Sequence, residues 1–138
     1  MQNYARLIPE ITVLDLDRSL RFWRDLIGFE VAYDRPEDRF AFLDLGGAQV
    51  MLEQFDEQAV DWITGPLDYP FGRGLNLQIE VASLAPVLAR LEQASWPLFI
   101  GPDERWHRVG PASQGQRRAL VLDPDGYLLR LAEPLGTR

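Results

Sequence analysis

Apolar and polar side chains alternate along several short segments of the chain. Alternation with a period of two predicts a strand, because successive side chains of a strand point to opposite faces. Pro and Gly residues between these segments mark turns and loops. The segments predicted as strands are 7–13, 29–33, 40–45, 49–55, 76–81, 96–100, 116–122 and 127–133.

Two further segments have the apolar spacing of amphipathic helices. The first helix is predicted to begin with Asp17 as its N-cap and to end at Gly28, with Trp23 in the core. The second helix is predicted over 84–94, with Ser83 as its N-cap. Each helix follows the first strand of one half of the chain.

The two halves of the chain repeat each other. The stretch 39–53 aligns with 118–132, and 11–23 aligns with 79–91, each at a constant offset. Because the two offsets differ, the second half carries a longer connection, which we place at 101–116. Each half reads as a strand, a helix and three strands, which indicates an internal duplication.

The repeat predicts an α+β fold of two tandem βαβββ modules. A chain of 138 residues is of ordinary size for one domain. We therefore expect a single domain over 1–138, with module one at about 5–55, a linker at 56–74 and module two at about 75–134.

Strand parity separates the side chains of these strands into two faces. One face is apolar and is expected beneath the helices. The opposite face is predicted to carry Glu10, Thr12, Gln49, Met51, Glu53, Asn76, Gln78, Glu80 and Arg130, joined by Phe40 and Phe42. This face is either a solvated outer surface, as is common for antiparallel sheets, or the lining of a cavity. In a cavity Arg130 must pair, because a buried unpaired charge is costly, and the candidate partners are Glu10, Glu53 and Glu80.

Charge and composition exclude several classes of function. The formal net charge of −7 argues against binding of nucleic acid, and it suits a cationic small molecule or serves solubility alone. Without cysteine the chain has no disulfide, no thiolate chemistry and no cysteine metal site. No apolar run is long enough to cross a membrane, and no secretory signal opens the sequence, so we expect a cytoplasmic protein.

Three stretches, 13–31, 47–55 and 120–133, give the chain its resemblance to the vicinal oxygen chelate superfamily. This superfamily includes glyoxalase I, extradiol dioxygenases, fosfomycin-resistance enzymes and bleomycin-resistance proteins. The resemblance implies paired βαβββ modules that form a curled mixed sheet around a cleft, with the helices on the outer face. It says little about the reaction, because the superfamily hosts many chemistries.

Metal chemistry is not expected from this resemblance. Enzymes of the superfamily hold a divalent metal with His and Glu side chains from four strands. The matching positions here are Ile8, Met51, Asn76 and Arg130. These are poor ligands for a divalent transition metal, so we expect no metal, no cofactor and no catalytic residue. A displaced carboxylate site at Glu10 and Glu53 is the remaining metal alternative.

The bleomycin-resistance branch resembles the chain most closely, through "GAQVMLEQF" and "DPDGYLLRL". This resemblance implies a homodimer that sequesters a cationic, aromatic drug in clefts between subunits, without chemistry. The candidate ligand-binding residues are Glu10, Phe40, Phe42, Met51, Glu53, Phe55, Trp62, Asn76, Trp106, His107 and Arg130.

Two alternatives stay open. One is an enzyme of the same fold, such as a lyase or a dioxygenase-like protein, with Glu10 or Glu53 as acid or base and Arg130 holding an anionic substrate. The other is an accessory module that sequesters a different natural product. The lone His107 is either a structural surface residue or a contact at the edge of a cleft, and Trp106 is assigned either to a dimer contact or to the ligand.

Overall fold

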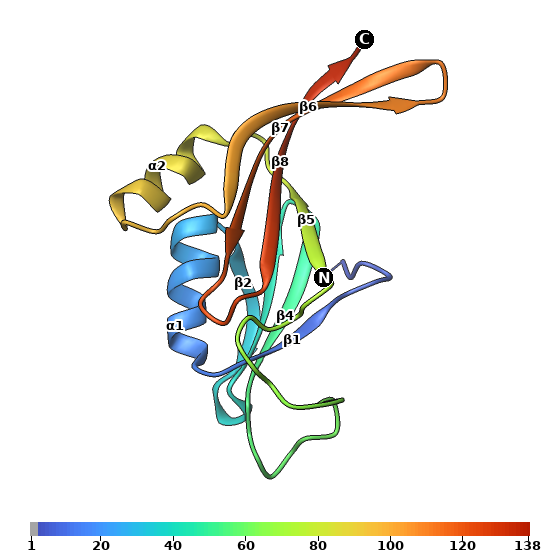
Figure 1. The fold of residues 1–138 in the computed structure, drawn as a ribbon. Coiled ribbons are helices and arrows are strands. Elements are labelled where there is room, and N and C mark those ends of the chain that lie inside the picture. The colour runs from blue at the N-terminus through green and yellow to red at the C-terminus, as the bar shows by residue number, and fades with distance from the viewer. Residues whose placement is uncertain (1–2) are drawn as a thin grey trace. The chain divides into compact units, whose positions relative to one another are not determined.

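The computed structural model describes residues 3–138, which form two compact units. Among the described residues, unit 1 comprises 3–71 and Pro124–Gly126, and unit 2 comprises Gly72–Asp123 and Tyr127–Arg138. Each unit holds one four-stranded mixed sheet, and the helices of each follow its first strand (Figure 1). The predicted α+β fold of two βαβββ-like modules is confirmed.

Unit 1 contains the sheet with strand order β1-β4-β3-β2. Its elements are β1 (Glu10–Val13), α1 (Leu16–Leu20), the π-helical continuation η1 (Arg21–Ile27), β2 (Glu30–Arg35), the 3₁₀ turn η2 (Pro36–Asp38), β3 (Phe40–Leu45) and β4 (Ala48–Gln54). Strand β1 runs parallel to β4, and the other neighbours are antiparallel.

The first helix begins earlier than the sequence predicts. Its N-cap is Asp15, not Asp17, because the Asp15 side chain accepts the backbone N–H of Arg18 at 3.1 Å. Asp15 has the extended backbone that an N-cap needs, whereas Asp17 already lies in the first turn. Gly28 ends the helix with a φ of 109°, as predicted, and Trp23 is fully buried.

Unit 2 contains the sheet with strand order β5-β8-β7-β6. Its elements are β5 (Asn76–Glu80), α2 (Ala85–Gln93), β6 (Ile100–Val109), β7 (Ala112–Leu122) and β8 (Leu128–Thr137). Strand β5 runs parallel to β8, and the other two pairs are antiparallel.

The start of α2 differs from the prediction. Ser83 does not cap the helix. Instead the Glu133 carboxylate of β8 accepts the backbone N–H of Leu84 at 2.7 Å. The first N–H groups of a helix lack intrahelical partners, and here a side chain distant in sequence supplies one.

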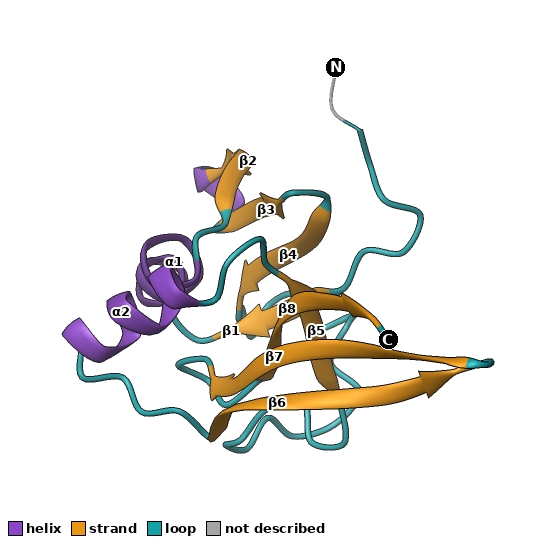
Figure 2. Cartoon of the chain, turned by 90° about the horizontal axis from the view of Figure 1, so that it is seen from above, coloured by secondary structure: helices purple, strands orange, loops and turns teal. Residues whose placement is uncertain are grey.

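The longer connection predicted at 101–116 is in fact a β-hairpin. Strands β6 and β7 pair from Ile100 opposite Leu120 to Val109 opposite Ala112, and both appear as strands along this length (Figure 2). The strand predicted at 96–100 is therefore wrong except for its last residue. Most side chains of β6 are exposed, so the strand lacks the apolar alternation on which the sequence prediction relies.

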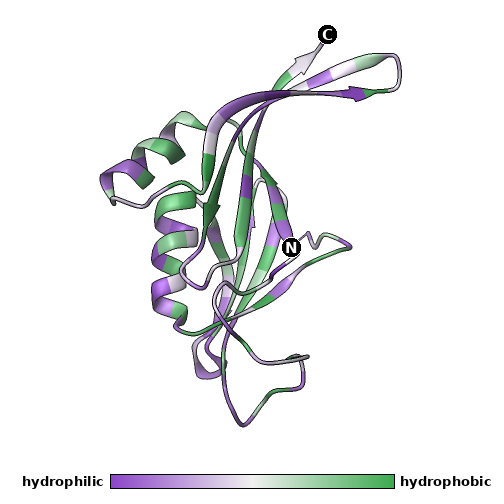
Figure 3. Ribbon diagram, viewed as in Figure 1, coloured by the Kyte–Doolittle hydropathy of each residue, from purple (hydrophilic) through white to green (hydrophobic). Residues whose placement is uncertain are grey.

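The apolar faces of the sheets are buried as strand parity predicts. Ile11, Val13, Val50 and Leu52 are buried in unit 1, and Ile79, Leu129 and Leu131 in unit 2. Hydrophobic and hydrophilic residues alternate along these strands (Figure 3). Within residues 3–138, the linker 56–74 contains no helix or strand, as expected. No helix among the described residues is long and apolar enough to cross a membrane.

Candidate functional site

The polar face of the unit 1 sheet is organised in three rows that run across its strands. The side chains of a row come from paired residues on neighbouring strands, so they point to the same side of the sheet. The first row is Glu30, Asp44 and Gln49; the second is Tyr33, Phe42, Met51 and Glu10; the third is Arg35, Phe40, Glu53 and Thr12. The predicted parity of β1, β3 and β4 is confirmed.

Aromatic rings on this face are covered by other side chains of unit 1. Phe40 is 3% exposed and Phe42 is 1% exposed. The ring of Tyr33 stacks on Phe42 with centroids 5.0 Å apart, and Tyr4 meets Phe42 edge-on at 5.5 Å. The guanidinium of Arg35 lies 4.0 Å from the centroid of the Phe40 ring. A ligand would reach these two phenylalanines only after Arg35 or Tyr4 moves aside.

Glu10 and Glu53 form a carboxyl pair on this face. Partial burial, a hydrogen bond with Glu53 and the negative charge of Glu53 raise the pKa of Glu10 to about 7, while the positive charge of Arg35 opposes the shift. A proton on Glu10 relieves the repulsion between the two negative charges. Near neutral pH Glu10 therefore exchanges a proton readily, and the pair attracts a cation.

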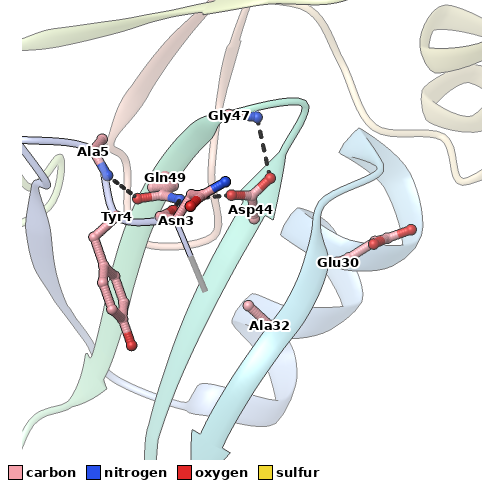
Figure 4. A pocket seen from close by; sticks show the side chains of 8 residues that line it. All are labelled: Asn3, Tyr4, Ala5, Glu30, Ala32, Asp44, Gly47 and Gln49. Atoms are coloured by element: carbon pink, nitrogen blue, oxygen red, sulfur yellow. Dashed lines mark hydrogen bonds between the residues drawn. The ribbon is translucent and has the colours of Figure 1, made fainter. Parts of the chain in front are cut away.

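A pocket of about 620 Å³ lies where the N-terminal segment crosses the first row (Figure 4). Gln49 links the N-terminal segment to the sheet through hydrogen bonds. Its side-chain NH₂ group donates to the carboxylate of Asp44 at 2.7 Å and to the backbone carbonyl of Asn3 at 2.6 Å. Its side-chain carbonyl accepts the backbone N–H of Ala5 at 2.7 Å. Glu30 and Asp44 are among the residues that line the pocket, and they give this part of the surface a negative charge.

Unit 2 carries Asn76 and Arg130 on the polar face of its own sheet. In the strand register, Arg130 lies opposite Gln78 on β5 and opposite Leu120 on β7. Its Nε atom is buried and has no hydrogen-bond partner within residues 3–138. Asn76, at the start of β5, is exposed.

Trp106 and His107 lie on the β6–β7 hairpin of unit 2. The Trp106 ring covers Gly115 on the neighbouring strand, and the Arg138 guanidinium lies 4.0 Å from the ring centroid. Trp106 also donates its indole N–H to Glu104 at 2.9 Å. These contacts give Trp106 a role in the hairpin that the sequence did not suggest, while His107 is exposed.

The two remaining predicted residues lie in unit 1, beyond β4. Phe55 is 38% exposed, and its backbone N–H donates to the carbonyl of Val13 at 2.7 Å. Trp62 is 73% exposed in the linker. An exposed Trp is a common anchor for a partner or ligand.

The donor set at the four metal-ligand positions of the superfamily does not fit a divalent metal. Ile8 and Met51 offer no oxygen or nitrogen, and Arg130 carries a permanent positive charge. Among residues 3–138 no group of three or more His, Cys, Asp or Glu side chains is placed to hold a metal ion. The carboxyl pair Glu10–Glu53 belongs to no such group.

Sequence reasoning missed Tyr33, Arg35 and Tyr4. The strand predicted at 29–33 stops two residues short of the end of β2, so Arg35 fell outside it. Tyr33 lay inside the predicted strand, and its pairing with Phe42 would have placed it on the polar face. Tyr4 precedes β1 in a segment without regular structure, where no periodic signal exists.

Two βαβββ-like modules with an open mixed sheet in each define the class of fold that glyoxalases and their relatives share. The model of the Glyoxalase/Bleomycin resistance protein/Dioxygenase superfamily matches residues 6–131. The chain belongs to this superfamily.

The chain is also similar to several solved structures. A superfamily member from Vibrio splendidus 12B01 is 32% identical over 93% of this chain and 97% of its own, with a TM-score of 0.37. A virulence protein from Salmonella typhimurium shares the fold at 20% identity and a TM-score of 0.66, over 96% of this chain and 98% of its own. TioX from Micromonospora sp. ML1 does so at 21% identity and a TM-score of 0.66, over 95% and 99%. No curated protein matches the chain at a significant level.

Proposed function

We propose that the chain is a metal-independent binding protein that sequesters a cationic, planar, antibiotic-like ligand on the polar face of the unit 1 sheet. The observation that carries this proposal is the Glu10–Glu53 carboxyl pair beside the aromatic rows of that face. The pair supplies negative charge where a cation would lie, and the rings supply flat apolar surface for stacking.

The position of Arg35 indicates where the cationic group of the ligand would bind. Its guanidinium is planar and positively charged, and it lies over the face of Phe40 in the same row as Glu53. The Arg35 side chain is 45% exposed, and its ion pair with Asp38 is a surface contact at 3.1 Å. A ligand cation would displace Arg35 at small cost, because exposed ion pairs contribute little.

The acidic balance of the chain supports the same class of ligand. A net charge of −7 attracts a cationic ligand over long range. The negatively charged pocket at Asp44 and Glu30 lies on the same face and offers room for a further positively charged group.

Isothermal titration with bleomycin tests the proposal. Wild-type protein is expected to bind at micromolar concentration, and Glu53→Gln is expected to weaken binding about tenfold, equivalent to about 1.4 kcal/mol. Glu37→Gln, which removes an exposed carboxylate of η2, is the matched control and should bind as the wild type does. Absence of binding removes bleomycin as the ligand. Equal effects of the two substitutions would remove the carboxyl pair as the site.

The variant Arg35→Gln tests whether the ligand binds over the ring of Phe40 or elsewhere on the surface. If the ligand cation takes the position of Arg35, removal of Arg35 should strengthen binding of bleomycin above pH 8, where Glu10 is ionised. Weaker binding would show that the ligand uses another surface.

We propose a homodimer as the assembly of this binding protein, as the bleomycin-resistance branch suggests. Sedimentation velocity measures it directly: a single species at twice the mass of the 15.8 kDa chain is expected, and a monomer across the accessible concentration range contradicts it.

An enzyme without a metal is the second candidate, and the pKa of Glu10 favours it. A carboxyl group with a pKa of about 7 serves as general acid or base near neutral pH. In this case a bound ligand is turned over, and the rate depends on Glu10. Mass spectrometry of the ligand after incubation distinguishes the two: sequestration returns it unchanged, whereas catalysis gives a product that Glu10→Gln fails to form.

A further inference from the structure

Arg130 occupies the middle of the unit 2 sheet. Strand β8 is an inner strand, with β5 on one side and β7 on the other. On the polar face, Arg130 has Gln78 beside it on β5 and Leu120 beside it on β7. Leu128 and Ala132 lie two residues before and after it on the same face of β8. Arg130 is therefore flanked within the sheet by side chains on all four sides.

Within the part of the chain that the structure describes, the Nε atom of Arg130 lacks the hydrogen-bond partner that a buried polar atom usually has. The Nε atom is buried and donates no hydrogen bond within the described residues 3–138. Buried polar groups are nearly always hydrogen-bonded, and an unsatisfied one is a candidate for ligand recognition. Arginine also keeps its charge under all physiological conditions, so the group cannot escape by deprotonation.

The charged neighbours on this face do not satisfy Arg130. Arg118, two residues before Leu120 on β7, pairs with Asp103: its Nε lies 2.8 Å from Oδ1 of that carboxylate, so the two charges offset each other. Glu80 lies diagonally across from Arg130, two residues beyond Gln78, and it is exposed and forms no ion pair with Arg130. Glu80 is a weak competitor, not a partner.

The surroundings define the chemistry that Arg130 can recognise. The Nε–H and Nη–H groups of a guanidinium form a planar fork that matches two oxygens of a carboxylate or phosphonate. Leu120 is 7% exposed and Leu128 is half-buried, so the neighbours on two sides are apolar. An oxyanion attached to an apolar group fits better here than a fully hydrated inorganic ion.

We infer that Arg130 is an anion-binding residue, which receives the carboxylate or phosphonate of a small organic ligand whose apolar part packs on Leu120 and Leu128. This inference uses unit 2 alone and does not rest on the proposed function. It assigns a role to the position where the metal-binding relatives carry a glutamate, with the opposite charge and the opposite preference.

The Nε–Hε resonance of Arg130 provides a direct test. Protein labelled with ¹⁵N-arginine is titrated in mildly acidic buffer with benzoate, phenylphosphonate, inorganic phosphate or benzyl alcohol. Benzoate and phenylphosphonate should move the Arg130 signal downfield in a saturable manner, because the Nε–H gains an acceptor. Inorganic phosphate should act more weakly, and benzyl alcohol should leave the signal in place.

Variants define what each outcome means. Arg130→Lys keeps the charge but removes the fork, and should weaken benzoate binding at least severalfold. Arg117→Gln alters the opposite face of β7 and should bind as the wild type does, whereas Glu80→Gln should bind more tightly. The wild-type titration needs no variant to fold, so it decides the matter by itself. A signal that no anion moves, or that benzyl alcohol moves equally, would overturn the inference.

The result is independent of the bleomycin titration. Glu37→Gln should leave benzoate binding unchanged, because Glu37 is an exposed residue of η2 that belongs to neither proposed site. Benzoate binding without bleomycin binding contradicts the proposed function only, and the reverse contradicts this inference only.

Discussion

The carboxylate of Asp125 lies 2.8 Å from the guanidinium of Arg18. It also accepts the backbone N–H of Leu14 at 3.2 Å, and Asp125 itself is 2% exposed. Asp125 belongs to the β7–β8 turn by sequence but to unit 1 by its contacts. Burial raises the pKa of Asp125, while the Leu14 N–H and Arg18 oppose the shift. The "DPDG" stretch therefore does more than form a turn, because its second aspartate binds Arg18 and the backbone of Leu14 in unit 1.

Removal of this carboxylate should destabilise the protein. Asp125→Ala is expected to lower the free energy of unfolding by about 1–3 kcal/mol, since it leaves the Leu14 N–H and Arg18 without their acceptor. Asp25→Ala, which breaks the exposed Arg24–Asp25 pair, is the control and should cost less than about 1 kcal/mol. Urea denaturation measures both. Similar midpoints for the two variants would contradict a structural role for Asp125.

The Glu10–Glu53 pair should make stability depend on pH. The pKa of Glu10 is about 7 in the folded protein and 4.5 in the absence of its neighbours, so the folded state binds the proton more tightly. Stability from this group is complete below about pH 4.5 and is lost as pH rises through about 7. Glu10→Gln, which cannot ionise, should therefore gain stability over the wild type between these values.

Thermal unfolding of wild type and Glu10→Gln across this pH range measures the effect. The difference in melting temperature should grow with pH up to about 7 and then level off. Glu37→Gln should show no such trend, because that carboxylate lies exposed on η2. A constant difference between Glu10→Gln and wild type would contradict the carboxyl pair.

Strand parity made the polar face of unit 1 predictable. Glu10, Met51 and Glu53 alternate with buried apolar residues along β1 and β4, and this period survives in the sequence whatever the strands pair with. The same rule placed Phe40 and Phe42 beside the carboxylates, and the strand register confirms it. Strand parity cannot predict which residues from outside the sheet cover this face. Tyr4, for example, contacts Phe42 from a segment without periodicity.

Errors arose where stability comes from distant or polar contacts. The β6–β7 hairpin is held by backbone pairing, and its exposed side chains resemble those of a loop. Ser83 had the residue type of an N-cap, yet Glu133 satisfies the helix from another strand. The residue preferences of helix caps and strands reflect local interactions only, and a contact with a residue distant in sequence can override them.

The roles of Glu133 and Ser83 at the start of α2 can be compared by substituting each residue. Glu133→Ala removes the acceptor of the Leu84 N–H and should cost about 1 kcal/mol, the usual loss for a helix cap. Ser83→Ala should cost only a few tenths of that, because Ser83 makes no cap hydrogen bond. Urea denaturation and the hydrogen-exchange rate of the Leu84 amide give the two readouts. A larger effect of Ser83→Ala would reverse the assignment.

Trp106 and Gly115 allow a sharper test of the hairpin. A Cβ at Gly115 would lie 2.6 Å from three atoms of the Trp106 ring, which is closer than real Cβ contacts allow. Gly115→Ala should therefore push the ring away, break its hydrogen bond to Glu104 and cost about 1–3 kcal/mol.

The indole N–H resonance of Trp106 reports this displacement. In Gly115→Ala it should shift towards the value of a solvated indole, because the acceptor on Glu104 is lost. Gly65→Ala is the matched control, since a Cβ there meets nothing within 4 Å and Gly65 has no positive φ. Trp106→Phe keeps a ring over Gly115 without the N–H, so it should preserve most of the stability that Gly115→Ala loses. If Gly115→Ala left the indole resonance unchanged, the packing of Trp106 on Gly115 would be wrong, and Trp106 would again be free to contact a ligand or a second subunit.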